Sequence, residues 1–216
     1  LRVPQIYEDF WLYWRDIEGS RRVGFPVDLS GAKSAAQRLA LREDKMIFYG
    51  VKELGLEGLL TVEGSAVQTL GDWNEGETAF RAVSEGISSL AKKGRYGQYA
   101  LVLSPNLFVD LHRIQPGTGV IELERVKGLV GGRVFNAVML EPNTALLVCA
   151  QSQYLDLMVG QDISTAYTEL VDLNHHLRIL EPVVLRVKAP DAIVVFKSVP
   201  DELQPVDGVT PGPLWP

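Results

Sequence analysis

Residues 1–29 read LRVPQIYEDFWLYWRDIEGSRRVGFPVDL, and aromatic and apolar side chains crowd the first half of this stretch. The stretch has no helical spacing of apolar residues and alternates in places, which favours two strands that turn at Gly19 and again near Gly24. A lone two-stranded hairpin is marginal in water, because it lacks a core of its own. The sequence therefore predicts that a further segment or a neighbouring subunit covers this hairpin. The aromatic residues expected at such an inter-subunit contact are Phe10, Trp11 and Trp14.

The following residues change to helical spacing. Apolar residues recur at helical intervals from 28 to 50, which predicts one long helix ended by Gly50. A second helix is expected from 77 to 93, with Asn74 and Glu77 placed as a capping box. Short helices are expected after Pro105 and before the glycine pair at 131–132.

Strand-like segments dominate the second half of the chain. They combine β-branched and apolar residues with turn residues between them. Early helices followed by late strands predict an α+β fold. The expected strands are YALVLS (99–104), RVF (133–135), ALLVCA (145–150), YLDLMV (154–159), STAYTELV (164–171), LRILEPVVLRVK (177–188) and AIVVF (192–196).

Composition narrows the classes of protein. The chain has 216 residues and 46% hydrophobic residues, enough for a substantial core. Its formal net charge of −6, with scattered basic residues, argues against a nucleic-acid-binding surface, which needs a basic face. Cys149 is the single cysteine, no apolar run approaches the ~18 residues of a membrane span, and no signal peptide is visible. We therefore expect a soluble cytoplasmic protein with neither nucleic acid nor membrane as partner.

The chain lacks a recognisable catalytic constellation. The glycine-rich KGLVGGRVF (127–135) has neither dinucleotide-binding nor phosphate-loop spacing. The adjacent pair His175-His176 would point to opposite faces of a strand, which disfavours a shared metal site. Cys149 sits inside an apolar strand, where a free cysteine is usually a small buried hydrophobe. His112 also lacks a partner at catalytic spacing, so no catalytic residue and no metal site is expected.

Six motifs together resemble one family. They occur in the order and spacing seen in encapsulins, the shell proteins of prokaryotic nanocompartments formerly grouped with linocin-type bacteriocins. The opening IYEDFWLYWRDIE is most similar to shells that house ferritin-like, iron-storing cargo. The motifs are EDKMIFYG (43–50), GLEGLLT (55–61), GQYALVLSP (97–105), GG (131–132), VGQDIS (159–164) and DAIVVF (191–196).

This resemblance implies the tailed-phage major capsid fold. Family members also carry an N-terminal segment with a helix ahead of the extended loop. The implied domains are an extended loop hairpin (1–27), a peripheral domain with the spine helix (28–61), an axial domain (62–159), further peripheral-domain strands (160–197) and a proline-rich tail (198–216).

The resemblance also implies three sites. A short targeting peptide of the cargo would bind at the GQDIS motif, on Gly160, Asp162 and Ile163. Trp14 matches a loop tryptophan that stacks on a flavin in some encapsulins; no other cofactor is expected. The loop near the five-fold pore would be Gln115, Pro116, Gly117, Thr118 and Gly119.

The predicted function is structural and non-enzymatic. The chain would be a subunit of an icosahedral shell that binds other copies of itself and encloses a cargo protein, with a ferritin-like protein for iron storage as the expected cargo. A phage or prophage major capsid protein is the first alternative, and the acidic chain argues mildly against it, since packaged DNA calls for cationic contacts. A small α+β enzyme or binding domain is the second alternative.

Overall fold

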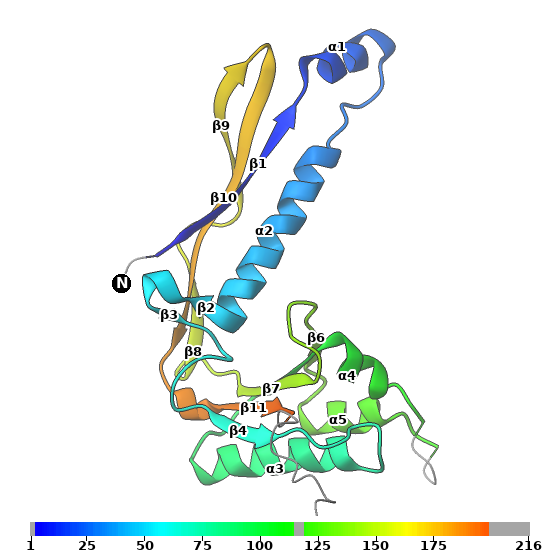
Figure 1. The fold of residues 1–216 in the computed structure, drawn as a ribbon, viewed down its shortest axis with the longest axis vertical. Coiled ribbons are helices and arrows are strands. Elements are labelled where there is room, and N and C mark those ends of the chain that lie inside the picture. The colour runs from blue at the N-terminus through cyan, green and yellow to red at the C-terminus, as the bar shows by residue number, and fades with distance from the viewer. Residues whose placement is uncertain (1–2, 115–118, 199–216) are drawn as a thin grey trace, which may run out of the picture.

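The computed structural model describes residues 3–114 and 119–198, and it is elongated, with one large β-sheet in each half (Figure 1). We call the two sheets the arm sheet and the base sheet. The arm sheet has the order β1-β10-β8, with β9 also paired to β10. Its strands are β1 (Gln5–Leu12), β8 (Leu155–Val159), β9 (Ser164–Val171) and β10 (Asn174–Val187).

The long helix α2 (Ser30–Tyr49) lies along the arm sheet (Figure 1). Its buried Ala35 and Leu39 pack against Phe10 of β1 and Ile179 of β10. The small alanine allows a close approach of helix and sheet, and the larger side chains fill the space beside it. This small apolar cluster holds the arm together, and the predicted helix from 28 to 50 is confirmed.

The base sheet has the order β4-β11-β7-β5-β6. All six residues of its central strand β7 are buried, because apolar clusters cover both faces. Helices α3 and α5 belong to the cluster on one face, and residues from the end of α2 belong to the cluster on the other. The strands are β4 (Ala66–Thr69), β5 (Tyr99–Leu103), β6 (Val134–Asn136), β7 (Thr144–Cys149) and β11 (Ile193–Lys197); the helices are α3 (Thr78–Lys92), α4 (Pro105–Asp110) and α5 (Glu122–Leu129).

A tight connection joins the two halves. Strands β2 (Gly50–Val51) and β3 (Leu56–Glu57) form a small antiparallel pair around the 3₁₀ turn η1 (Lys52–Leu54). The next residues bind back to the end of α2, where Leu59 N donates to Ile47 O at 2.9 Å and Leu60 N donates to Phe48 O at 2.9 Å. The second short 3₁₀ turn, η2 (Pro190–Ala192), precedes β11.

The predicted N-terminal hairpin is wrong. Residues Trp14–Val23 form a helix, α1, and β1 pairs with the distant β10, from Gln5 opposite Pro182 to Leu12 opposite His175. The helix has Asp16 in its first turn, an ion pair of 3.2 Å between Glu18 and Arg21, and Gly24 as a left-handed end. These are ordinary helix signals, and the aromatic residues before them obscured the change of period.

Two strands lie outside their predicted domains. Strand β8 was expected in the 62–159 domain but pairs with β10 in the arm sheet. Strand β11 was expected among the 160–197 strands but pairs with β4 and β7 in the base sheet. The predicted domain boundaries at 159–160 and 197–198 are therefore wrong for these two strands. The chain leaves the arm sheet at the end of β10 and enters the base sheet at β11, after η2. The predicted capping box also fails, since no side chain caps the N-terminus of α3.

Within the described ranges, every helix is too short or too polar to cross a membrane.

One ion-pair cluster ties β8 to β10 and predicts a pH effect. Asp156 binds Arg186 through both oxygens at 2.6 Å, and Lys188 Nζ lies 2.6 Å from its Oδ2. The hydrogen bonds from Arg186, and then from Lys188, lower the pKa of Asp156 to about 2. Because the folded pKa lies below the usual 3.8, the stabilisation is complete above that value and is lost as the pH falls towards 2.

We expect Asp156→Asn to lower the denaturant midpoint near about pH 7 and to lose most of this effect near about pH 2, where the wild-type carboxyl also becomes protonated. The measurement is urea unfolding at both pH values. Glu85→Gln, at an exposed position on α3, is the control and should leave the midpoint unchanged at neutral pH. An equal loss for Asp156→Asn at both pH values would contradict the ion-pair explanation.

Candidate functional site

The GQDIS turn joins the ends of β8 and β9, and it is fixed to β10. Gly160 N donates to Pro182 O at 2.7 Å, and Gln161 Nε2 donates to Ser164 Oγ at 3.0 Å. A Cβ atom on Gly160 would lie 3.3 Å from Pro182 Cγ, so the turn packs closely on β10 at this position. The anchored backbone leaves the side chain of Asp162 exposed and that of Ile163 53% exposed.

An apolar strip adjoins this turn. Leu157 and Val159 are both exposed, and they lie on the same face of β8, two residues apart. Val159 pairs with Val183 of β10, which is fully buried. Both side chains point to the side of the arm sheet that faces α2. Together with Ile163, these side chains provide apolar contacts along an edge strand, the kind of surface that takes an extended peptide.

Unpaired acidic groups lie beside the same turn. Glu181 of β10 is 6% exposed, and its Oε2 has no hydrogen-bond partner among the described residues. Burial, and then the nearby Asp162, raise the pKa of Glu181. Burial, and then Glu181 and Asp44, likewise raise the pKa of Glu43 on α2. The turn therefore borders two carboxyl groups whose surroundings disfavour their ionised form.

Sequence reasoning did not identify Glu43 and Glu181, although a signal was present. Glu43 follows Leu39 by four residues and so falls on the buried stripe of α2. Glu181 alternates with Ile179 and Val183 on the buried face of β10. A carboxylate at a position where the pattern of each element expects a buried apolar residue was the signal that could have identified them.

The three aromatic residues of the predicted inter-subunit hairpin have different surroundings. Phe10 is only 7% exposed and packs in the arm cluster of its own subunit, so its assignment as a contact to neighbours is corrected. Trp11 stacks on His176 with ring centroids 4.4 Å apart. Trp11 and Trp14 keep 37% and 46% of their surface exposed. Their contact with a neighbouring subunit stays a prediction.

The surroundings of Trp14 bear on the predicted flavin. Trp14 is anchored through its backbone N, which donates to Asn174 Oδ1 at 3.1 Å, and its ring lies at a surface pocket together with Arg15. Asp16 and Asp172 line the same pocket, so its charge does not favour a ligand that carries a negative group. Flavin binding here stays a prediction.

Most of the predicted pore loop lies outside the described residues, namely Gln115, Pro116, Gly117 and Thr118. The described end of the loop includes Gly119, whose φ of 67° suits a turn. Ile114 and Ile121 flank the loop and form an antiparallel bridge. The role of the loop as a pore stays a prediction.

The groups considered for catalysis have structural surroundings. Cys149 is fully buried in the base-sheet core, where burial raises the pKa of its thiol and so disfavours a reactive thiolate. His112 Nδ1 lies 2.7 Å from Phe108 O, and His175 contacts the ring of Tyr167. In the two described ranges, no three His, Cys, Asp or Glu side chains are placed to hold a metal ion.

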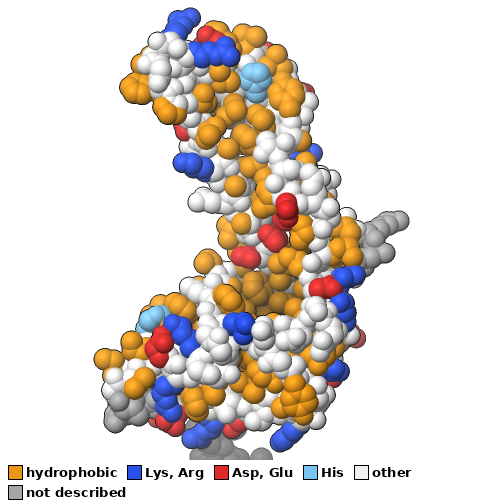
Figure 2. Space-filling model, turned by 180° about the vertical axis from the view of Figure 1, so that it is seen from behind, with side chains coloured by type: hydrophobic (Ala, Val, Ile, Leu, Met, Phe, Trp, Pro, Cys, Tyr) orange, Lys and Arg blue, Asp and Glu red, His pale blue; other side chains and the backbone are white. Residues whose placement is uncertain are grey.

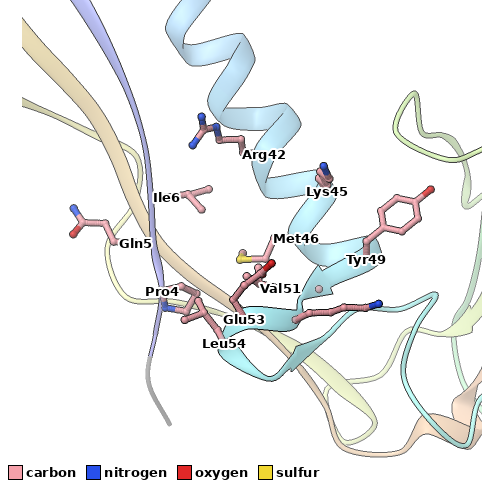
Figure 3. Close-up of a pocket in the computed structure, with 12 residues that line it drawn as sticks. Pro4, Gln5, Ile6, Arg42, Lys45, Met46, Tyr49, Val51, Glu53 and Leu54 are labelled. Atoms are coloured by element: carbon pink, nitrogen blue, oxygen red, sulfur yellow. The ribbon is translucent and has the colours of Figure 1, made fainter.

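A cavity of about 530 Å³ lies between β1, the end of α2 and the β2–η1 segment (Figure 3). Ile6 and Met46 give it an apolar part, and Arg42 and Lys45 line its upper side in Figure 3. Arg42 is already bound, with its Nε 2.5 Å from Glu8 Oε1. Its lining, as the structure describes it, contains no Ser, Thr, Cys or His side chain, and the cavity is separate from the GQDIS turn.

Comparisons with known proteins identify the family. The family model described as "Encapsulating protein for peroxidase" matches residues 1–184. The chain is 42% identical to the type 1 encapsulin shell protein EncA of Myxococcus xanthus, over 91% of this chain and 68% of the relative. It is 40% identical to a diheme-cytochrome-encapsulin shell fusion protein of Kuenenia stuttgartiensis, over 91% of this chain and 54% of the relative. The chain thus spans between about half and about two thirds of these relatives.

Solved structures show the fold. A virus-like particle from Pyrococcus furiosus aligns with a TM-score of 0.77 at 21% identity, over 90% of this chain and 77% of that one. The capsid of a Myoviridae phage aligns with a TM-score of 0.68 at 11% identity, over 91% of this chain and 74% of that one. The predicted α+β, tailed-phage capsid fold is confirmed. The chain belongs to the encapsulins, a family of structural shell proteins rather than enzymes.

Proposed function

We propose that the full protein self-assembles into a closed icosahedral shell that encloses a cargo protein. The observation that carries this proposal is the 42% identity with a protein named as an encapsulin shell protein, over 91% of this chain. The exposed Trp11 and Trp14 support it, since aromatic residues are enriched at protein interfaces. We place the shell in the cytoplasm, in keeping with the free Cys149.

The phage-capsid alternative has weaker support. Phage capsids resemble the chain in fold at 11% to 14% identity, which carries no statement about function. The net charge of −6 also disfavours packaging of DNA, because an interior that holds DNA needs cationic contacts.

The proposed cargo is a ferritin-like iron-storing protein. One relative from Pyrococcus furiosus is named as a fusion of a ferritin-like protein with an encapsulin shell, which supports this class. The relative from Kuenenia stuttgartiensis is named as a diheme-cytochrome fusion, which makes a haem protein the competing class. Metal and haem analysis of purified shells from the native host distinguishes the two: iron without haem supports ferritin-like cargo.

Assembly is tested directly by electron microscopy and size-exclusion chromatography of the purified full-length protein. We expect uniform hollow particles that elute far ahead of a single subunit, because closed symmetry covers the exposed aromatic surfaces. A stable monomer or dimer at about micromolar concentration, a range in which specific interfaces are usually formed, would contradict the proposal.

Cargo capture at the GQDIS turn gives a separate prediction. We expect Asp162→Ala combined with Ile163→Ser to leave assembly intact, because both side chains are exposed, and to lower the amount of native cargo in the shell. Repetition of the site over many subunits amplifies the loss of each weak contact. The control replaces Glu85 with Ala and the exposed Val67 with Ser, away from the turn. Equal cargo content in the two variants would remove this turn from the binding site.

A further inference from the structure

The arm sheet has one face covered by α2 and a second face that carries aromatic and charged side chains. Phe10, Leu177 and Ile179 belong to the cluster that packs with α2. Because side chains alternate along a strand, Trp11 and His176 point to the other face. Strands β1 and β10 place these two residues opposite each other, and their rings stack with centroids 4.4 Å apart. Figure 2 shows histidine among exposed hydrophobic side chains in this half of the molecule.

Charged groups from three strands surround the His176 ring. Asp9 on β1 has its Oδ2 3.7 Å from Nε2 of the ring, and Glu169 on β9 has its Oε1 3.7 Å from Nδ1. Arg178, two residues along β10, binds both oxygens of Asp9 at 2.7 and 2.9 Å. Two carboxylates thus face one guanidinium, so a positive charge on His176 balances the charge of this group.

Thr168 on β9 determines which ring nitrogen of His176 carries the proton in the neutral form. Its Oγ1 donates to His176 O at 2.8 Å and lies 2.7 Å from His176 Nδ1. A hydroxyl group has one hydrogen and a carbonyl oxygen can only accept, so Nδ1 donates to Oγ1. Nε2 of the neutral ring is then an acceptor that faces the Asp9 carboxylate, which is also an acceptor. A second proton, on Nε2, turns this unfavourable contact into an ion pair.

Asp9 remains ionised over the pH range in which an imidazole titrates. Its hydrogen bonds from Arg178 lower the pKa of Asp9 below the usual 3.8, against the opposite effect of burial. An ordinary imidazole exchanges its proton near about pH 6.5, well above that range. Asp9 therefore presents a negative charge to His176 whenever the ring is protonated, and the stacked Trp11 ring then contacts a cation as well.

We infer that His176 forms a proton-dependent link between β1 and β10, in which a second proton on Nε2 joins the ring to Asp9 and Trp11. Protonation favours the folded arm, so the added stability is present at mildly acidic pH and is lost as the pH rises and the proton leaves. The link lies within one subunit and does not depend on the proposed function. Since Trp11 is predicted to contact a neighbouring subunit, the link also connects that predicted contact to pH.

The first test is the tryptophan fluorescence of the full-length protein, because a protonated imidazole quenches a stacked indole more strongly than a neutral one. We expect a reversible loss of emission as the pH falls from about 8 to about 5. Trp11→Phe and His176→Asn should both abolish this loss, since asparagine keeps a donor near the position of Nδ1 but takes no second proton. His175→Asn is the matched control, because the His175 ring contacts Tyr167 instead, and it should keep the loss. An unchanged pH response in His176→Asn overturns the inference.

The second test is urea unfolding of the wild-type protein and His176→Asn, followed by circular dichroism at two pH values. We expect the unfolding equilibrium constant of the variant to exceed that of the wild type about threefold to fivefold near about pH 5.5, the upper range for a partly exposed ion pair. Near about pH 8, where an imidazole is neutral, the two proteins should unfold alike. An equal difference at both pH values would show that His176 only fills space, and the inference would then be wrong.

Thr168→Val tests the assignment of the proton to Nδ1. Valine has nearly the same shape as threonine but offers no acceptor, so neutral His176 becomes free to carry its proton on Nε2 and donate it to Asp9. The neutral form then gains the contact that only the charged form has in the wild type. We therefore expect the fluorescence change of this variant to move to lower pH than in the wild type. A change at the same pH as in the wild type contradicts the assignment and, with it, the inference.

Discussion

We expect Gly58→Ala to prevent folding of the subunit or to destabilise it by more than about 4 kcal/mol, a loss reserved for severe structural damage. A Cβ atom at position 58 would lie 2.4 Å from Gly50 N and 2.5 Å from the carbonyl group of Phe48. Both neighbours are backbone, so no side-chain rotation relieves the clash. Gly50 is equally confined, because its Cβ would lie 2.1 Å from Leu56 O and its φ is 73°.

This contact matters because it lies where the two halves of the subunit join. The segment after Gly58 binds the last turn of α2 and delivers Leu59, Leu60 and Val62 into the cluster that covers one face of the base sheet. Displacing it would separate α2 from that sheet. The measurements are soluble yield, circular dichroism and the urea midpoint. Gly128→Ala is the control, because a Cβ there meets nothing within 4 Å and the residue lies in helix α5.

We expect the control to keep or slightly raise the midpoint, since alanine is the better helix former by about 0.5–1 kcal/mol. A wild-type midpoint for Gly58→Ala would mean that the connection between the halves relaxes without cost. That result would contradict the close backbone packing described for Gly50 and Gly58.

The sequence predicted elements whose signal is local. The helical spacing from 28 to 50 corresponds to α2 (Ser30–Tyr49), and the expected strand 164–171 is β9 (Ser164–Val171). The helix buries one side against the arm sheet, and the strand alternates its side chains between the two faces of that sheet. Periodicity and end signals were therefore sufficient to predict both elements. The fully apolar run at β7 was likewise readable, because both of its faces are buried.

Long-range pairing was not readable in the same way. Strand β1 pairs with β10, which lies near the other end of the sequence. No short turn connects the two strands, so no local sequence signal predicts the pairing. The assignment of β11 to the wrong half has the same origin, since it pairs in parallel with β4, which precedes it by more than a hundred residues. Such contacts depend on the whole fold rather than on neighbouring residues.

The candidate site shows a similar division. Resemblance indicated the GQDIS turn, and the structure adds how Gly160 fixes it to Pro182. Sequence analysis did not single out Glu43 or Glu181 as site residues, because solvent-exposed acids are common and a single sequence does not show burial. Only the structure reveals that Glu181 is buried and that Glu43 is half-buried.

The aromatic residues of β1 and α1 give the second large prediction, in which neighbouring side chains have opposite effects. We expect Phe10→Ala to lower the stability of the subunit by about 3–5 kcal/mol, the usual cost of removing a buried aromatic ring. Phe10 packs with Ala35, Leu39 and Ile179, so the cavity opens inside the arm cluster. The measurement is the urea midpoint of the purified protein.

Replacement of Trp11 and Trp14 by Ser should instead leave the subunit folded and weaken assembly. Both rings are exposed and lie outside the apolar clusters, and the stacking of Trp11 on His176 is worth only about 0.5–1.5 kcal/mol. If neighbouring subunits cover these rings, each loss is repeated at every equivalent contact of the shell, so few particles should form. Tyr96→Ser, at an exposed aromatic in the base half, is the matched control. Intact particles of unchanged melting temperature from the double variant would show that these tryptophans do not hold the shell together. Neighbouring subunits would then have to contact the other exposed apolar residues of the arm, such as Tyr167 and Leu170 of β9.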